Sequence, residues 1–300
     1  MALRTRFAPS PTGLLHVGNA YSALICQAWA EEHDAELLLR IEDIDHTRCR
    51  SEYADAILED LAWLGLQWQG PVRYQSRHLD AYQQAIIRLR GMDVIYPCFC
   101  TRKQVAREIA YMASAPHSED MLSEYPGICR NMQVDEQQQR MQQEPFAWRL
   151  NVAKAMAQLG TSMTWRDESG KTHAIEVSQD MVIGRKDIGF SYHLAVVVDD
   201  ALQGISHIIR GRDLAESTGI HRLLQQLLGL PEPVYIHHRL LKDSNGNRLA
   251  KRNHATTLNS LRSMGVDAHK LGSFLLGMAK PAWPFEADKK AAVLRILGKT

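Results

Sequence analysis

The sequence lacks several features that mark special classes of protein. No run approaches ~20 apolar residues, and the first residues, Met-Ala-Leu-Arg, form no apolar signal region, so we expect neither a membrane-spanning helix nor a secretory leader. Cysteine is scarce: the five residues are an odd number, which favours a reducing compartment over a disulfide framework. No internal repeat or low-complexity tract is present. We therefore expect a cytoplasmic protein with an ordinary packed core and no membrane partner.

An excess of charge of one sign is also missing. The formal net charge is +1, which neither demands nor excludes nucleic acid, because binding needs only a local basic face. Two groups of cations could form such faces. They are Arg40, Arg48 and Arg50, and Lys242, Arg248, Lys251 and Arg252. With 300 residues, 45% of them hydrophobic, the chain is long enough for one large core and one or two smaller units.

The stretch 6–19 joins a short apolar run to a helix through a loop that suits an anion. Two prolines, Pro9 and Pro11, hold the loop extended, while two glycines, Gly13 and Gly18, let the backbone approach a ligand closely. His16 lies just ahead of the predicted helix N-terminus, where N–H groups and the helix dipole favour phosphate. By spacing alone, an ordinary tight strand-to-helix connection remains the alternative.

The start of the chain predicts a βαβ unit, with strands over 3–8 and 36–41 and a helix over 18–33. Such units form parallel sheets, and ligands lie beyond the carboxyl ends of the strands. Glu42, Asp43 and Asp45 directly follow the second strand and are expected to face the same crevice as His16. The fold class is therefore α/β.

Further elements follow along the chain. Helices are predicted over 53–64, 76–91 with Ser76 as N-cap, 135–143 and 213–228, and strands over 146–152, 161–166, 194–200, 205–210 and 234–236. The strands at 194–200 and 205–210 are interpreted as the second half of the first sheet. This divides the chain into a first catalytic half (1–95), an inserted α+β subdomain (96–189), a second half (190–252) and a helical C-terminal region (253–300).

The loop resembles the HIGH-type signature of class I aminoacyl-tRNA synthetases. Its sequence is similar to that of glutamyl- and glutaminyl-tRNA synthetases. The matching residues are Arg6-Phe7-Ala8-Pro9-Ser10-Pro11-Thr12-Gly13, followed by His16-Val17-Gly18-Asn19. The resemblance implies a Rossmann-like parallel sheet and an ATP site. The implied ATP-binding residues are Pro11, Gly13, His16, Gly18 and Asn19, with Mg²⁺ accompanying the nucleotide.

A second signature is the basic loop Arg248-Leu249-Ala250-Lys251-Arg252. Taken alone, a short basic loop is most often a solvated surface. Here it follows the second half of the predicted sheet and resembles the KMSKS loop of the same synthetases, with Ala250 in place of the serine. The resemblance implies that Lys251 contacts the ATP phosphates and acts with His16 in catalysis.

Amino-acid recognition is expected to use charges of both signs, because glutamate carries two carboxylates and an ammonium group. The positions that match the family's glutamate site are Arg6, Ala8, Ser10, Glu42, Tyr192 and Arg210. Taken singly, such residues have ordinary interpretations as a surface arginine, a turn serine, a capping glutamate or a core tyrosine. One position departs from the pattern: Val196 stands where the glutamyl-tRNA synthetases usually have asparagine.

Three cysteines, Cys98, Cys100 and Cys129, form a third constellation. Three thiolates and one further ligand suit tetrahedral Zn²⁺ in a structural site, and buried cysteines or a redox pair are the alternatives. The segment resembles the zinc element of bacterial glutamyl-queuosine synthetases, which implies Tyr125 as fourth ligand, while His117 competes with it. Cys26 and Cys49 are interpreted as packing or surface residues, and His207, His221, His237 and His238 as structural histidines.

The 48 residues from 253 to 300 are too few for a separate anticodon-reading domain. Together with Val196 and the tyrosine-type zinc element, this makes the chain similar to the glutamyl-Q tRNA(Asp) synthetases. That resemblance implies ATP-dependent activation of L-glutamate and transfer to queuosine in the anticodon loop of tRNA(Asp), by a monomer. The alternatives are a truncated synthetase that charges the 3′ end of tRNA(Glu) and a non-catalytic tRNA-binding paralogue.

Overall fold

A parallel sheet near the start of the chain carries the predicted βαβ unit. The computed structural model describes residues 2–101, 103–105, 125–160, 163–241 and 257–279. Strand β1 (Arg4–Phe7), helix α1 (Val17–Glu32) and strand β2 (Glu36–Ile41) follow one another as predicted. β2 pairs in parallel with β1 on one side and with the short β3 (Arg73–Tyr74) on the other. The unit is thus confirmed.

A second pair of parallel strands, β9 (His207–Gly211) and β10 (Val234–His238), adjoins the first sheet. The Ser206 N–H donates to the Arg4 carbonyl at 3.0 Å, and the Cys26 thiol lies 3.7 Å from the Arg6 carbonyl and 3.9 Å from that of Ile209. These contacts advance in the same direction along β1 and β9, so the two strands run parallel. The carboxyl ends of β1, β2 and β9 therefore meet at one edge.

The predicted strand over 194–200 is wrong, because this segment is part of helix α7 (Tyr192–Leu202). The seven residues from Leu194 to Asp200 are all buried, so the run shows no amphipathic period, and three consecutive valines favour a strand in isolation. The helix begins where the Ser191 hydroxyl accepts from the Leu194 N–H at 3.4 Å. Its apolar side chains pack in a core with those of α3 (Leu79–Gly91) and α8 (Ser217–Leu227).

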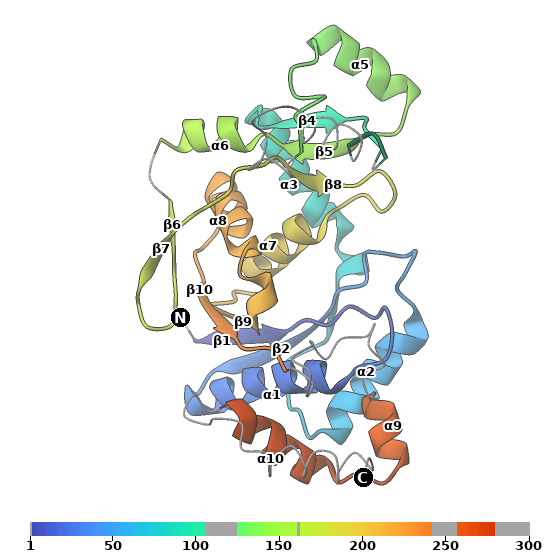
Figure 1. Cartoon of the computed structure of the whole chain (residues 1–300), viewed down its shortest axis with the longest axis vertical. Coiled ribbons are helices and arrows are strands. Elements are labelled where there is room, and N and C mark those ends of the chain that lie inside the picture. Colours follow the sequence, from blue (N-terminus) through green and yellow to red (C-terminus); the bar gives the residue numbers. More distant parts are fainter. Residues whose placement is uncertain (1, 102, 106–124, 161–162, 242–256, 280–300) are drawn as a thin grey trace, which may run out of the picture.

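Helices cover both sides of the strands. Figure 1 shows α1 on one side of β1, β2, β9 and β10, and α7 and α8 on the other. Beyond α1 lie α9 (Leu258–Ser263) and α10 (Ala268–Ala279); Leu271 and Leu275 share the core of α1. Helix α2 (Ser51–Trp63) packs there through Ile57 and Leu61.

Two predicted helix starts are wrong by a few residues. The helix predicted from Ser76 begins at Leu79, after a 3₁₀ turn (Gln75–Arg77). Ser76 does not cap it, because its backbone N–H and its hydroxyl donate to Asp43, at 2.8 and 2.6 Å. The helix predicted from 213 begins at Ser217, after a 3₁₀ turn (Arg212–Leu214).

The segment predicted as an insertion builds an antiparallel sheet of its own. Strands β4 (Ile95–Cys98), β5 (Ala147–Leu150) and β8 (Met181–Gly184) pair in that order. A hairpin of β6 (Thr164–Arg166) and β7 (Thr172–Ala174) turns at Ser169-Gly170, as predicted. Helix α6 (Val152–Leu159) follows β5, and α5 (Val134–Gln143) projects at the far end in Figure 1. The domain boundaries themselves stay predictions.

A helix that crosses a lipid bilayer has to be long and apolar. None of the helices in the described segments combines the necessary length and hydropathy.

The burial of α7 predicts a contrast between two leucines of that helix. Leu194 is 0% exposed and Leu202 is 61% exposed. Leu194→Ala should lower the free energy of unfolding by about 2–5 kcal/mol, whereas Leu202→Ala should change it by no more than about 0.5 kcal/mol. Urea unfolding followed by tryptophan fluorescence measures both. Equal losses would contradict the placement of this helix.

Candidate active site

A cavity of about 790 Å³ opens at the carboxyl ends of β1, β2 and β9. It collects most of the predicted ATP and glutamate residues. These are Arg6, Ala8, Ser10, His16, Gly18, Asn19, Glu42, Tyr192 and Arg210. Pro11 and Gly13 belong to the same loop but are not among the residues that line the cavity. Lys251 and Ala250 lie outside the described residues, as do Lys242, Arg248, Arg252 and His117.

His16 is the N-cap of α1, in agreement with its predicted place. Its Nδ1 accepts from the Gly18 N–H at 3.0 Å, while the Asn19 side-chain oxygen accepts from the His16 N–H at 3.1 Å. Since Nδ1 is an acceptor, the neutral ring carries its proton on Nε2. The imidazole thus stands at the positive end of the helix, which attracts anions.

A buried network of ion pairs holds two of the predicted glutamate residues. Arg6 pairs with Asp200 at 2.9 Å, and Arg40 pairs with Asp200 at 2.7 Å and with Glu42 at 3.1 Å. Arg40 is 0% exposed, so its interpretation as part of a basic surface face is wrong. The two positive charges of Arg6 and Arg40 thus balance the two negative charges of Asp200 and Glu42.

Burial and ion pairing act in opposite directions on these carboxyl groups. Burial raises the pKa of Glu42, although Arg40 and Arg6 oppose it. Burial also works to raise the pKa of Asp200, but the two arginines lower it below its ordinary value. Asp200 therefore stays ionised in the core and fixes the Arg6 guanidinium at the cavity.

Asp199, the neighbour of Asp200, lies 3.9 Å from Arg40 and also anchors α7 to further side chains. It accepts from Arg73 at 2.8 Å, from Gln75 at 2.8 Å and from the Tyr82 hydroxyl at 2.8 Å. Sequence reasoning missed Arg40, Asp199 and Asp200. The available signal was a charged side chain inside an apolar run, which demands a buried partner.

Two predicted crevice residues do not line the cavity. Asp43 accepts from Ser76, as described above, and Asp45 accepts from Thr47 at 2.6 Å and from Arg48 at 2.7 Å. Asp43 thus contacts a residue 33 positions away, and Asp45 contacts its own loop. The expectation that Asp43 and Asp45 face the same cavity as His16 is therefore wrong; of the three acidic residues after β2, Glu42 alone lines it.

Arg210 is held in a different way from Arg6. It donates to Thr218 Oγ1 at 2.8 Å, to His221 Nδ1 at 3.0 Å and to His237 Nε2 at 3.3 Å. Burial lowers the pKa of this arginine, but a guanidinium stays protonated in proteins at neutral pH, so Arg210 is charged. His221 and His237 thus contact a predicted substrate residue, and His238 lines the cavity.

Tyr192 and Val196 both belong to α7 but lie in different surroundings. Tyr192 lines the cavity from the first turn of the helix. Val196 is buried in the apolar core with α3 and α8 and is not among the lining residues.

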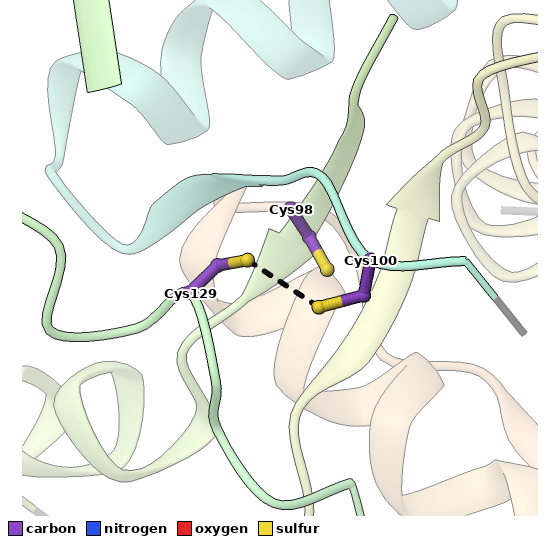
Figure 2. A group of neighbouring side chains, drawn as sticks. All are labelled: Cys98, Cys100 and Cys129. Atoms are coloured by element: carbon purple, nitrogen blue, oxygen red, sulfur yellow. Dashed lines mark hydrogen bonds between the residues drawn. The ribbon is translucent and has the colours of Figure 1, made fainter. Parts of the chain in front are cut away.

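The predicted zinc residues gather at the end of β4 and in the segment that contains Tyr125. Figure 2 shows the thiols of Cys98, Cys100 and Cys129 turned toward one another, and the three sulfurs lie within 4.8 Å of each other. The Cys100 and Cys129 sulfurs are 3.5 Å apart. Zn–S bonds of about 2.3 Å in a tetrahedron place sulfurs roughly 3.8 Å apart, so the spacing suits one ion.

Tyr125 closes the fourth side of the cysteine cluster. Its hydroxyl lies 3.4 Å from the Cys98 sulfur and 3.8 Å from that of Cys100, and it accepts from the Cys129 N–H at 3.2 Å. The Arg149 guanidinium lies over the ring, 3.6 Å from its centroid. Hydrogen bonds from Cys129 and Tyr125 lower the pKa of the Cys98 thiol, whereas burial and the contact with Cys98 raise the pKa values of Tyr125 and Cys129. Without a metal the cluster therefore favours one thiolate, at Cys98, and the other ligands lose their protons when the metal binds.

The Arg40 network predicts a large loss of stability when its centre is removed. Arg40→Met removes the ion-pair partner of Glu42 and one of the two cations that pair with Asp200, and should lower the free energy of unfolding by about 3–5 kcal/mol. Arg48→Met is the control, because Arg48 also pairs with a carboxylate but its side chain is 68% exposed, and its loss should cost about 0–1 kcal/mol. Urea unfolding compares the two. A loss below 1 kcal/mol for Arg40→Met would refute the role of this network.

Known proteins resemble the chain over most of its length. A protein from Rhodobacter capsulatus named Glutamyl-Q tRNA(Asp) synthetase is 41% identical over 276 residues, covering 87% of this chain and 95% of that protein. A protein of the same name from Nitratidesulfovibrio vulgaris is 37% identical over 287 residues, covering 92% and 86%.

A solved structure and a family model agree with these relatives. The crystal structure of a glutamate tRNA ligase from Elizabethkingia meningosepticum, in complex with its amino acid, superposes with a TM-score of 0.71 at 26% identity. The match covers 85% of this chain and 53% of that ligase, so this chain spans about half its length. The model of the family "tRNA synthetases class I (E and Q), catalytic domain" matches residues 2–288. The chain belongs to this family of class I tRNA synthetases, whose members are ligases.

Proposed function

We propose that this chain activates L-glutamate with ATP and transfers the glutamyl group to the queuosine base at the wobble position of tRNA(Asp). The name of its relatives at 37% and 41% identity supports the acceptor. The observation that carries the amino-acid half is the cavity, where two arginines and Glu42 meet from separate strands.

The cavity provides complementary groups for both ends of glutamate. Arg6 and Arg210 supply donors for carboxylates, and Glu42 supplies an acceptor for the ammonium group. Ser10, Tyr192 and the backbone of Ala8 complete the walls of the amino-acid site. We assign the glutamate site to these six residues.

The nucleotide binds at the N-terminus of α1. His16, Gly18 and Asn19 line the cavity there, and Pro11 and Gly13 shape the loop that leads to it. A glutamate α-carboxylate oxygen attacks the ATP α-phosphorus, forming glutamyl-adenylate while pyrophosphate leaves. His16 and Lys251 stabilise the charge that develops on the phosphates, and Mg²⁺ bound to ATP shields it.

The second step transfers the acyl group. A hydroxyl of the cyclopentenediol of queuosine attacks the acyl carbon, the bond to phosphate breaks, and AMP leaves with the electron pair. The paired hydroxyls of that ring imitate the 2′,3′-diol of a terminal ribose. A cavity suited to acyl transfer onto a terminal ribose can therefore also transfer the acyl group to queuosine in an anticodon loop.

Charging with radiolabelled glutamate tests the acceptor. We expect label on tRNA(Asp) that carries queuosine and none above background on unmodified tRNA(Asp) or on tRNA(Glu). Prior periodate oxidation, which destroys both the 3′ diol and the queuosine diol, should abolish labelling. Prior glutamylation should protect the base diol from the same reagent.

Two other outcomes separate the alternatives. Label on the 3′ end of tRNA(Glu) would make the chain an aminoacyl-tRNA synthetase of the usual acceptor type. Absence of glutamate-dependent pyrophosphate exchange would indicate a tRNA-binding paralogue without catalysis.

We further propose a structural Zn²⁺ held by Cys98, Cys100, Cys129 and Tyr125. The thiol spacing and the phenol oxygen beside it support this ligand set. The ion would tie the end of β4 to the segment of Tyr125 and Cys129, two parts of the chain that share a small apolar cluster. No part of the acyl transfer depends on it chemically.

Metal analysis of purified variants tests the zinc site. We expect about one zinc per chain in the native protein and loss of most of it in Cys129→Ser. Cys49→Ser is the matched control, because Cys49 lies outside the cluster, and it should retain the metal. Tyr125→Phe should release zinc to a chelator faster than His117→Ala does; the reverse order would assign the fourth position to His117.

A further inference from the structure

The two arginines of the cavity, Arg6 and Arg210, differ in the charge of the groups that accept their hydrogen bonds. Arg6 donates to the Asp200 carboxylate. Arg210 donates to a hydroxyl and two imidazole nitrogens, and among the described residues no carboxylate lies within 4.0 Å of it. Asp213 also lines the cavity, but no ion pair joins it to Arg210.

The direction of the hydrogen bonds fixes the protonation of the histidines. Arginine can only donate, so His221 Nδ1 is an acceptor and the His221 proton is on Nε2. That N–H faces His193 Nδ1 at 3.1 Å, so the His193 proton is on its own Nε2. The contacts thus run from Arg210 through His221 to His193, and each ring in this chain is neutral.

Burial reinforces this neutral state. His221 is 1% exposed and Arg210 is 6% exposed. Burial and the neighbouring Arg210 charge lower the pKa of His221 well below its ordinary value. The same two causes lower the pKa of His193 to about 4. A proton on either ring would place a second positive charge beside a buried guanidinium.

We propose that His221 is a positioning residue that orients Arg210 while leaving its charge uncompensated, and that this makes the cavity selective for a substrate with net negative charge. The inference rests on the proposed function and deepens it. Glutamate carries one net negative charge, whereas its amide carries none. A carboxylate at position 221 would hold the same guanidinium equally well but neutralise it before the substrate arrives.

Two substitutions of similar size separate charge from geometry. His221→Gln offers a neutral oxygen to Arg210, and His221→Glu offers an anionic one. We expect the KM for glutamate in pyrophosphate exchange to be about ten-fold or more higher in His221→Glu than in His221→Gln, since charge-assisted hydrogen bonds to substrate are lost. The KM for ATP should be the same in both, and kcat should differ much less than the KM for glutamate.

Thermal unfolding distinguishes this effect from misfolding. Because the new carboxylate pairs with Arg210, His221→Glu should unfold at a temperature no lower than His221→Gln. If His221→Glu does not fold, Thr218→Asp and Thr218→Asn provide the same comparison of an anionic with a neutral side chain, because Thr218 also accepts a hydrogen bond from Arg210. Equal KM values for glutamate within a folded pair would overturn the inference. Absence of glutamate-dependent exchange in the native protein would instead refute the proposed function.

Discussion

The buried carboxylate of Asp200 is the contact on which the arrangement of the cavity depends. It lies on α7 and pairs with Arg6 of β1 and Arg40 of β2, residues 194 and 160 positions earlier in the chain. Removing a carboxylate from water costs several kcal/mol unless a cation compensates it. The two guanidinium groups therefore compensate this carboxylate where α7 packs on the sheet, and this packing brings Tyr192 to the cavity.

The early part of the fold could be predicted because its local signals agree. Strand β1, helix α1 and strand β2 lie where their apolar residues predict them, and a loop with two prolines and a glycine separates β1 from α1. The segment 194–200 could not be assigned correctly in the same way. A helix buried on every side has no polar face, and its valines favour a strand locally; only packing against α3 and α8 decides between the two.

The residues of the candidate site likewise divide into those that the sequence identified and those whose roles it did not reveal. Residues of the site could be identified from a linear signature where they lie in one short stretch of the chain, as His16, Gly18 and Asn19 do at the start of α1. Arg40 was interpreted as surface charge, since its partners Asp199 and Asp200 are far away in the sequence. His221 was interpreted as structural because histidine spacing alone says nothing about a guanidinium on strand β9. Contacts between different elements of the fold determined both roles, and no local pattern records them.

The distribution of charge in the cavity follows from which elements supply the partners. Arg6 and Arg40 meet carboxylates because β1 and β2 lie against α7, which carries Asp199 and Asp200. Arg210 lies on β9, against α8, whose side chains there are a hydroxyl and an imidazole. One arginine is consequently fixed by a direct carboxylate pair, while the other has no carboxylate within 4.0 Å among the described residues. A ligand anion can therefore form the close charge pair with Arg210 that Asp200 already forms with Arg6.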